Sequence, residues 1–133
     1  MGVEKVIDII RRAGAPDVPI YIFGPKMTFT KKILDFARAN FRVYSFNKYA
    51  MKYVDRDLKV SITKTVRDML KGKKYKNVFF VDVLGVQCGK DYLNCDVLSA
   101  KKEFLYFDGG YFTLVGSRLF GRKLKLAYPR FFN

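Results

Sequence analysis

The sequence of 133 residues contains no histidine and no tryptophan, and it has only two cysteines. Without histidine, a Ser–His–Asp triad and every other arrangement with a histidine general base are excluded. Two thiols without imidazole also cannot supply the four nitrogen and sulfur ligands of a structural zinc site. We therefore expect a protein that is not an enzyme and that binds no metal and no cofactor.

Long apolar runs are absent as well. No stretch approaches the roughly 20 apolar residues that a membrane-spanning helix needs. The first residues, Gly2-Val3-Glu4-Lys5, lack the cationic start and the long apolar segment of a secretory signal. The sequence therefore predicts a soluble, intracellular (cytoplasmic) protein with no membrane partner.

Acidic residues are scarce: 12 Asp and Glu stand against 26 Lys and Arg, which gives a formal charge of +14. This excess is larger than solubility requires, and it favours a polyanionic partner. Nucleic acid, anionic lipid and an acidic protein all fit that description, because net charge reports attraction and not shape. A homo-oligomer is a further alternative that composition leaves open.

Cys88 and Cys95 stand seven positions apart in a segment that contains glycine. A disulfide could close this loop if the chain folds back on itself. Cytosolic thiols of ordinary organisms stay reduced, so we favour two free, half-buried thiols and keep the disulfide as the alternative. The single glutamine of the chain hints at a thermophilic source, where intracellular disulfides occur.

The sequence does contain a strand–turn–helix–strand unit over residues 20–49, around which the rest is organised. Residues 20–23 are a β-branched and aromatic run between a proline and a glycine, which is typical of a buried strand. Apolar residues then recur at helical spacing over residues 28–40, and residues 41–46 alternate with period two. A crossover of this length normally makes its two strands parallel.

Two further helices are predicted from apolar periodicity. The first covers residues 3–13 and should pack against the core. The second begins at a capping Asp55 or Asp57 and ends at Gly72. Its predicted buried stripe is Leu58, Ile62, Val66 and Met69. Its predicted outer side carries Lys59, Lys64, Arg67 and Asp68.

The second half of the chain predicts strands. Residues 77–84 are apolar on both faces except for Asp82, which is the pattern of a central strand. Residues 103–107 and 111–115 flank a glycine-containing turn and predict a β-hairpin. Residues 123–128 alternate as an amphipathic edge strand before a proline.

Together these elements predict one α/β domain over residues 1–133 with a mixed sheet. Up to residue 93, their order and spacing resemble the thioredoxin-like fold, and more narrowly its glutaredoxin branch. Met27-Thr28-Phe29-Thr30 stands where that family carries its Cys-x-x-Cys, so the resemblance implies the fold without thiol–disulfide catalysis. The family closes with a helix, whereas residues 94–133 are predicted to form a basic, β-hairpin-rich extension.

The turn after the first predicted strand is a candidate anion site. Gly24-Pro25-Lys26 stands at the predicted start of a helix, with Lys31 one turn further on. Free N–H groups and the helix dipole favour an anion there, so Gly24, Lys26 and Lys31 could hold a phosphate. The spacing fails the P-loop pattern, and a plain turn is the alternative.

Asp82 stands where a Walker-B strand would carry its metal-holding acid. No P-loop accompanies it, and no second acid has a convincing spacing. We therefore favour an Asp82 that is paired with a basic side chain or a backbone N–H, and we predict no metal site.

Two basic segments form the candidate nucleic-acid interface. The first covers residues 71–76, and the second follows Gly109, after which no acidic residue occurs. Cations contact phosphates and aromatic faces stack on unpaired bases, so this mixture suits backbone-directed or single-stranded binding. The alternative is a solvated edge strand whose lysines prevent aggregation. The candidate residues are Lys71, Lys73, Lys74, Lys76, Arg118, Arg122, Lys123, Lys125 and Arg130.

The leading hypothesis is a non-catalytic module that binds a polyanion, above all nucleic acid, without sequence preference. The second hypothesis is a structural or assembly scaffold, built on a redox fold that lost its active site, with an acidic protein or a second copy as its partner. The third is an enzyme that acts on a phosphorylated small molecule at residues 24–31.

Overall fold

The computed structural model describes residues 2–14, 17–30, 43–73 and 75–132 of the chain. Helices dominate, and the strands form one small sheet, so the chain has the α/β character that the sequence predicts. The elements in chain order are α1 (Val3–Arg12), β1 (Ile20–Phe23), α2 (Val43–Ala50), the 3-10 helix η2 (Met51–Tyr53), α3 (Arg56–Lys73), β2 (Val78–Val81), α4 (Val83–Cys88), α5 (Leu114–Ala127) and the 3-10 helix η3 (Pro129–Phe132).

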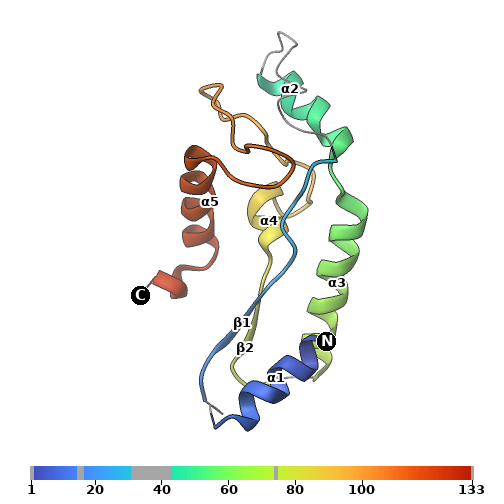
Figure 1. The fold of residues 1–133 in the computed structure, drawn as a ribbon, viewed down its shortest axis with the longest axis vertical. Helices are drawn as coiled ribbons and strands as arrows, with labels where there is room; N and C mark the ends of the chain where they lie inside the picture. The colour runs from blue at the N-terminus through green and yellow to red at the C-terminus, as the bar shows by residue number, and fades with distance from the viewer. Residues whose placement is uncertain (1, 15–16, 31–42, 74, 133) are drawn as a thin grey trace.

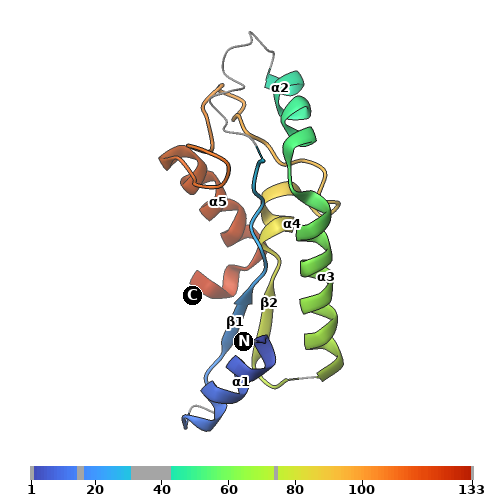
Figure 2. The ribbon, with the colours of Figure 1, turned by 45° about the vertical axis from the view of Figure 1, so that its right-hand side comes forward.

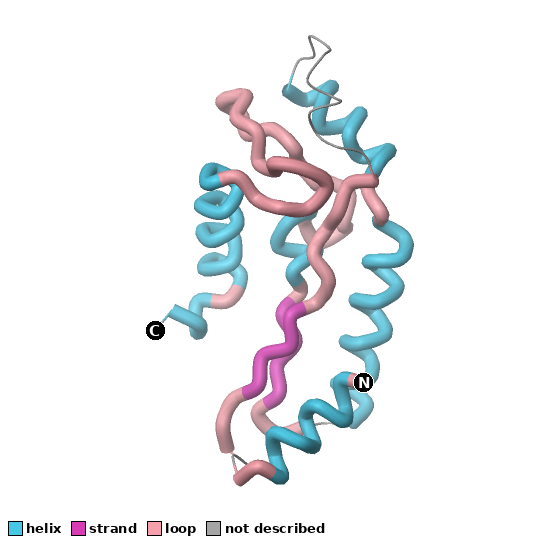
Figure 3. Tube along the Cα trace, in the orientation of Figure 1, coloured by secondary structure: helices cyan, strands magenta, loops and turns pink. Residues whose placement is uncertain are grey.

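The strands β1 and β2 lie side by side and run parallel, with Ile20 opposite Val78 and Phe23 opposite Val81. Figures 1 and 2 show α3 along one side of this pair, α1 at its lower end, and α5 beside α4 on the side away from α3. The described chain between the two strands is largely helical, and such a crossover makes strands parallel. Figure 3 shows how short the strands are beside the loops and helices around them.

The helices predicted at residues 3–13 and 55–72 are confirmed as α1 and α3. The predicted buried stripe of α3 is wrong for its first half, because Leu58 is 55% exposed and Ile62 is 38% exposed, while Val66 and Met69 are half-buried. Thr63 and Leu70 are buried instead, and Arg67 lies between them on the same face. Arg67 pairs with Asp82, so an ion pair and a threonine occupy positions that apolar periodicity does not detect.

The strand predicted at residues 41–46 is wrong where the structure describes it, because Val43–Ala50 is the helix α2. Phe46 and Ala50, four positions apart, are buried on one side of this helix. The helix predicted over residues 28–40 is not formed at residues 28–30, where Phe29 makes an antiparallel bridge to Val54. Residues 31–42 lie outside the described residues. The resemblance to the thioredoxin-like fold was based in part on the helix predicted at residues 28–40 and the strand predicted at residues 41–46. It stays a prediction.

The strand predicted at residues 77–84 ends at Val81. Asp82 ends it, because the Asp82 side chain accepts a hydrogen bond of 2.9 Å from the Gly85 N–H and caps α4. Leu84 is therefore a buried helical residue and not a strand residue. Within the described residues β2 pairs with β1 alone, so the prediction of a central strand is also wrong.

The predicted β-hairpin is reduced to a turn with a single bridge between Tyr106 and Phe112. The Asp108 carboxylate accepts hydrogen bonds from two backbone N–H groups of this turn, at 2.8 and 3.0 Å. Neither Gly109 nor Gly110 has a positive φ. Gly109 is required for a different reason, because an added Cβ would lie 2.5 Å from the Phe29 carbonyl oxygen.

The edge strand predicted at residues 123–128 is wrong, because the chain from Leu114 to Ala127 is the helix α5. The Thr113 hydroxyl caps this helix by accepting a hydrogen bond of 3.0 Å from the Gly116 N–H. Val115 and Leu119, four positions apart, then pack against the core. Burial of this helical face stabilises the helix more than the alternation of lysine and leucine near its end favours a strand.

The core lies beyond the carboxyl ends of the strands, among α2, α4, the loop after β1 and the loop between α4 and α5. Gln87 joins these loops: its Oε1 accepts from the Met27 N–H at 2.8 Å, and its Nε2 donates to the Tyr106 hydroxyl at 3.2 Å. A disulfide joins Cys88 and Cys95, which are both almost completely buried, so the prediction of two free thiols is wrong.

Candidate functional site

Three hollows in the surface meet at Tyr128, the residue that follows α5. The first, of about 560 Å³, lies between the start of the strand pair and η3. The second, of about 620 Å³, lies between α3 and β2, and shares Phe79 and Phe80 with the first. The third, of about 590 Å³, lies between α4 and the end of α5 and shares Asp82 with the second. We call the three hollows together the Tyr128 groove.

Tyr128 is held in place by the strand that it faces. Its hydroxyl accepts a hydrogen bond of 2.8 Å from the Asp82 N–H. In a parallel pair, successive residues point their N–H groups to opposite edges. The Val81 carbonyl accepts from the Gly24 N–H on the β1 side, so the Asp82 N–H points to the open edge of the sheet. The Tyr128 hydroxyl accepts the hydrogen bond from this N–H and so holds the end of α5 against the edge of the sheet.

Most of the charged residues that line the Tyr128 groove are cations. They come from four separate parts of the chain, namely α3, the turn after α4, α5 and η3. Asp82 is the one acid among the described residues that line it, and Arg67 neutralises this acid through an ion pair of 2.6 Å. The remaining cations therefore give the groove a positive field that no lining acid cancels. These cations are Lys71, Lys90, Lys123 and Arg130.

The Asp82 carboxylate is fully engaged by the protein. Its Oδ2 accepts from the Arg67 guanidinium and, at 2.8 Å, from the Tyr92 hydroxyl, while its Oδ1 accepts from the Gly85 N–H. The hydrogen bond to Tyr92, reinforced by the charge of Asp82, raises the pKa of Arg67. Burial raises the pKa of Tyr92. This network supports the predicted paired role of Asp82.

No group of three or more metal-binding side chains occurs in the part of the chain that the structure describes. The cations and aromatic rings that line the groove offer electrostatic attraction and aromatic contact.

The first predicted basic segment is split by the structure. Lys71, in the last turn of α3, lines the second hollow of the Tyr128 groove. Lys73 pairs with Glu4 and Lys76 pairs with Asp17, each at 3.4 Å, and all four side chains are well exposed. Such exposed ion pairs are weak, but they lower the local field. Lys74 lies outside the described residues.

The second predicted basic segment is mostly helical, so its cations are distributed over the faces of a helix and not over the two faces of a strand. Arg118, Arg122 and Lys125 fall at i, i+4 and i+7 on α5 and are all exposed, so they form one cationic stripe. Lys123 is turned away from this stripe and lines the third hollow. Leu126, one turn after Arg122, lines the same hollow, so the α5 stripe ends beside the Tyr128 groove.

The predicted phosphate site after β1 is occupied by the protein itself. The Lys26 ammonium donates a hydrogen bond of 2.7 Å to the Gly110 carbonyl and lies 4.8 Å from the centre of the Tyr111 ring. The Phe29 N–H donates to the Gly109 carbonyl. Gly24 packs against the Phe80 ring, where an added Cβ would lie 2.9 Å away. Lys31 lies outside the described residues, and the arrangement around Lys26 does not favour an anion.

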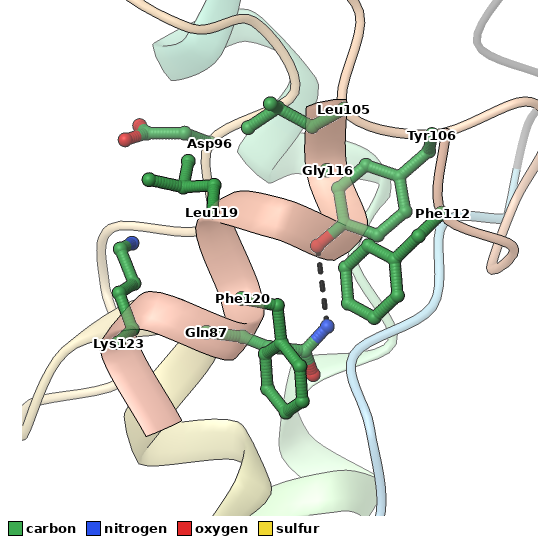
Figure 4. Close-up of a pocket in the computed structure, with 9 residues that line it drawn as sticks. All are labelled: Gln87, Asp96, Leu105, Tyr106, Phe112, Gly116, Leu119, Phe120 and Lys123. Atoms are coloured by element: carbon green, nitrogen blue, oxygen red, sulfur yellow. Dashed lines mark hydrogen bonds between the residues drawn. The ribbon is translucent and has the colours of Figure 1, made fainter. Parts of the chain in front are cut away.

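A small pocket lies between α4, α5 and the loop before α5 (Figure 4). Its volume of about 20 Å³ accommodates one water molecule and no larger ligand. Burial raises the pKa of Asp96 beside it, and Lys123 partly opposes this effect. Burial also raises the pKa of Tyr106 to about 12, although the hydrogen bond to Gln87 acts in the other direction. This pocket is too small to be a candidate site for anything larger than water.

Sequence reasoning missed several residues of the groove. Arg67 was placed on the outer face of its helix, and Lys90 was not singled out. Tyr21 and Phe79 were assigned to buried strands, but they lie opposite each other in the sheet and are 39% and 42% exposed. Their alternation within two short aromatic runs was a signal for a shared face, because strand side chains alternate between faces.

Comparison of the chain with protein-family models, with curated proteins and with solved structures finds no match. None of the helices described has the length and apolar character to cross a membrane. The Tyr128 groove is therefore interpreted from its own geometry and charge.

Proposed function

We propose that this protein binds nucleic acid without sequence preference, through the Tyr128 groove and the α5 stripe. One observation carries the proposal: cations from four parts of the chain line one groove whose single lining acid is neutralised by Arg67. The formal charge of +14 strengthens attraction at a distance. No enzymatic activity is needed for such a role, and we propose none.

Contact with the phosphate backbone explains the expected lack of sequence preference. Ammonium and guanidinium groups that touch phosphates release condensed counterions, which supplies affinity without reading any base. Four groove cations and the three residues of the α5 stripe could contact several phosphates of one strand. Affinity should then fall steeply as salt rises.

The test is a salt titration of binding to a fluorescent oligonucleotide, followed by anisotropy. Each lost phosphate contact should lower the slope of log affinity against log salt by about 0.7 to 0.9. We expect this for Lys71→Ala, Arg122→Ala, Lys125→Ala and Arg130→Ala. Lys101→Ala is the matched control, because Lys101 is exposed on a loop that does not line the groove. No binding at low salt, or equal slopes in all five variants, would reject the proposal in favour of the scaffold hypothesis.

The buried disulfide bears on where this binding takes place. Disulfides persist in oxidising compartments, and Cys88 and Cys95 are both joined and buried. We therefore propose an oxidising compartment in place of the cytoplasm that the sequence led us to predict. Thiol labelling of the denatured protein after acid quenching of source cells tests this, because both residues are buried in the fold, and labelled Cys88 and Cys95 would restore the cytoplasmic location.

A further inference from the structure

The first hollow of the Tyr128 groove is unusually rich in aromatic rings. Five of the ten residues that line it are aromatic, and Arg130 lies among them. These rings are Tyr21, Phe79, Phe80, Tyr128 and Phe131. A groove that only attracted phosphates would need cations at its surface and no exposed rings. Attraction of phosphates therefore does not explain the aromatic lining.

Four of these rings form two stacked pairs, one on the strands and one in the segment after α5. Tyr21 and Phe79 stack on the strands, with ring centres 5.4 Å apart. Tyr128 and Phe131 stack in the segment after α5, with centres 5.3 Å apart and planes within 6° of parallel. The two pairs stand at a steep angle, because Phe131 meets Tyr21 edge-on at 4.5 Å. Both pairs line the hollow of about 560 Å³.

The strand pair of rings keeps a large accessible surface. Phe79 is 42% exposed and Tyr21 is 39% exposed, although both belong to the sheet. Aromatic surface of this kind gains free energy when a flat ring stacks on it. Nucleobases supply such a ring in every sequence, and stacking on aromatic side chains is the usual way to hold an unpaired strand.

We infer that the Tyr128 groove selects single-stranded nucleic acid, and that an unpaired base stacks in the first hollow on Phe79 or Phe131. This inference rests on the proposed function. In a duplex the base faces are already stacked on their neighbours, so the rings of the hollow gain nothing from a duplex. Cations attract both forms, so preference for the single strand comes from the rings.

The cations stand where the backbone of such a strand would run. Arg130 lines the first hollow beside Phe131, and Lys71 lines the second hollow, which shares Phe79 and Phe80 with the first. A base in the first hollow would therefore have a cation within the same hollow and another in the next one. Charge complementarity thus favours a phosphodiester strand over an uncharged aromatic ligand.

The experiment compares three probes by anisotropy at one low salt concentration. They are an oligothymidine, a duplex of equal length, and a deoxyribose–phosphate oligomer with the same number of phosphates and no bases. We expect the native protein to bind the oligothymidine about fivefold or more tightly than the oligomer without bases. Phe79→Leu and Phe131→Leu should remove most of this difference and leave binding to the oligomer without bases unchanged.

Phe107→Leu is the matched control, because Phe107 is 66% exposed on a loop that does not line the groove. Circular dichroism and the unfolding midpoint show whether each variant folds, and either variant alone suffices for the test. Equal binding of all three probes by the native protein would overturn the stacking inference while the proposed function stands. Absence of binding to every probe would instead reject the proposed function.

Discussion

The two ends of the molecule are built in different ways. The core end, made of α2, α4, the start of α5 and the loops that pack around them, holds most of the buried apolar residues, for example Met27 and Val97. The strand end, made of α1, β1, β2 and η3, leaves Phe23 55% exposed and Phe79 42% exposed. From this comparison we infer that the core end contributes most of the stability, whereas the strand end carries the exposed rings of the candidate binding surface.

The core end is stabilised by side chains that bind backbone groups. Asn47 shows this, since its Oδ1 accepts hydrogen bonds of 2.9 Å from the N–H groups of both Val97 and Leu98. Irregular loops can be buried only when their polar groups find such partners. The loop after α4 therefore depends on a few particular side chains, and changes there should cost more than changes at the strand end.

The largest effect is expected for Gly116→Ala, at the core end. An added Cβ would lie 1.9 Å from the Leu105 carbonyl oxygen, which is backbone and cannot move away easily. We expect a loss of about 3 kcal/mol in the free energy of unfolding, measured by denaturant titration. Gly121→Ala is the control on the same helix. It meets nothing within 4 Å and should stabilise the protein by up to about 1 kcal/mol.

Equal stability of the two glycine variants would show that α5 does not pack closely against the loop at Leu105.

The second effect concerns the disulfide of the core end. The Cys88→Ser, Cys95→Ser double variant should lose about 2 kcal/mol of unfolding free energy, because the bond closes a short loop in the unfolded chain. Mass spectrometry of the native protein without reductant should show a mass two hydrogens below that of the reduced chain. Two free thiols in protein purified under oxidising conditions would contradict the bond.

A smaller effect is expected for Phe79→Leu at the strand end. Phe79 is 42% exposed, so the shorter side chain should cost less than about 1 kcal/mol of unfolding free energy. Val97→Ala is the comparison at the core end, where Val97 is completely buried, and it should cost more. A larger loss at Phe79 than at Val97 would mean that the strand end is not the less stable of the two regions.

The smallest effect is expected for Asp96→Asn, and it depends on pH. Burial raises the pKa of Asp96 above 3.8, so the folded state holds the proton more firmly than the unfolded state does. Stability from this residue is therefore present at low pH and is lost as the pH rises through the raised pKa. Asp96→Asn should be more stable relative to the native protein at pH 7 than at pH 3, in denaturant titrations at both values. The opposite trend would show that the attraction of Lys123 outweighs burial.

Local patterns in the sequence determined several features of this protein. The amphipathic periodicity of α1 and α3, the two apolar runs that become β1 and β2, and the turn at Asp108 are all visible within short windows. The charge of +14 follows from composition alone. These predictions succeed because each depends on interactions between residues that are close in the chain.

The wrong predictions concern short segments whose pattern of apolar residues is compatible with more than one secondary structure. Residues 123–128 alternate like a strand, yet their helix is fixed by the cap at Thr113 and by burial of Val115 and Leu119. Asp82 interrupts an apolar run that looked like one strand, because its carboxylate can cap a helix. In both places the choice of secondary structure depends on a helix cap and on burial, which the pattern of apolar residues does not show.

Only the tertiary structure decided the groove and the disulfide. The lining of the groove joins Tyr21, Phe79 and Arg130, which are far apart in the sequence. The hydrogen bond from the Asp82 N–H to Tyr128 spans 46 positions. Contacts of this kind depend on how whole elements pack, and no local periodicity encodes them. Composition therefore determined that the protein is strongly basic, while packing decided which cations and rings share one surface.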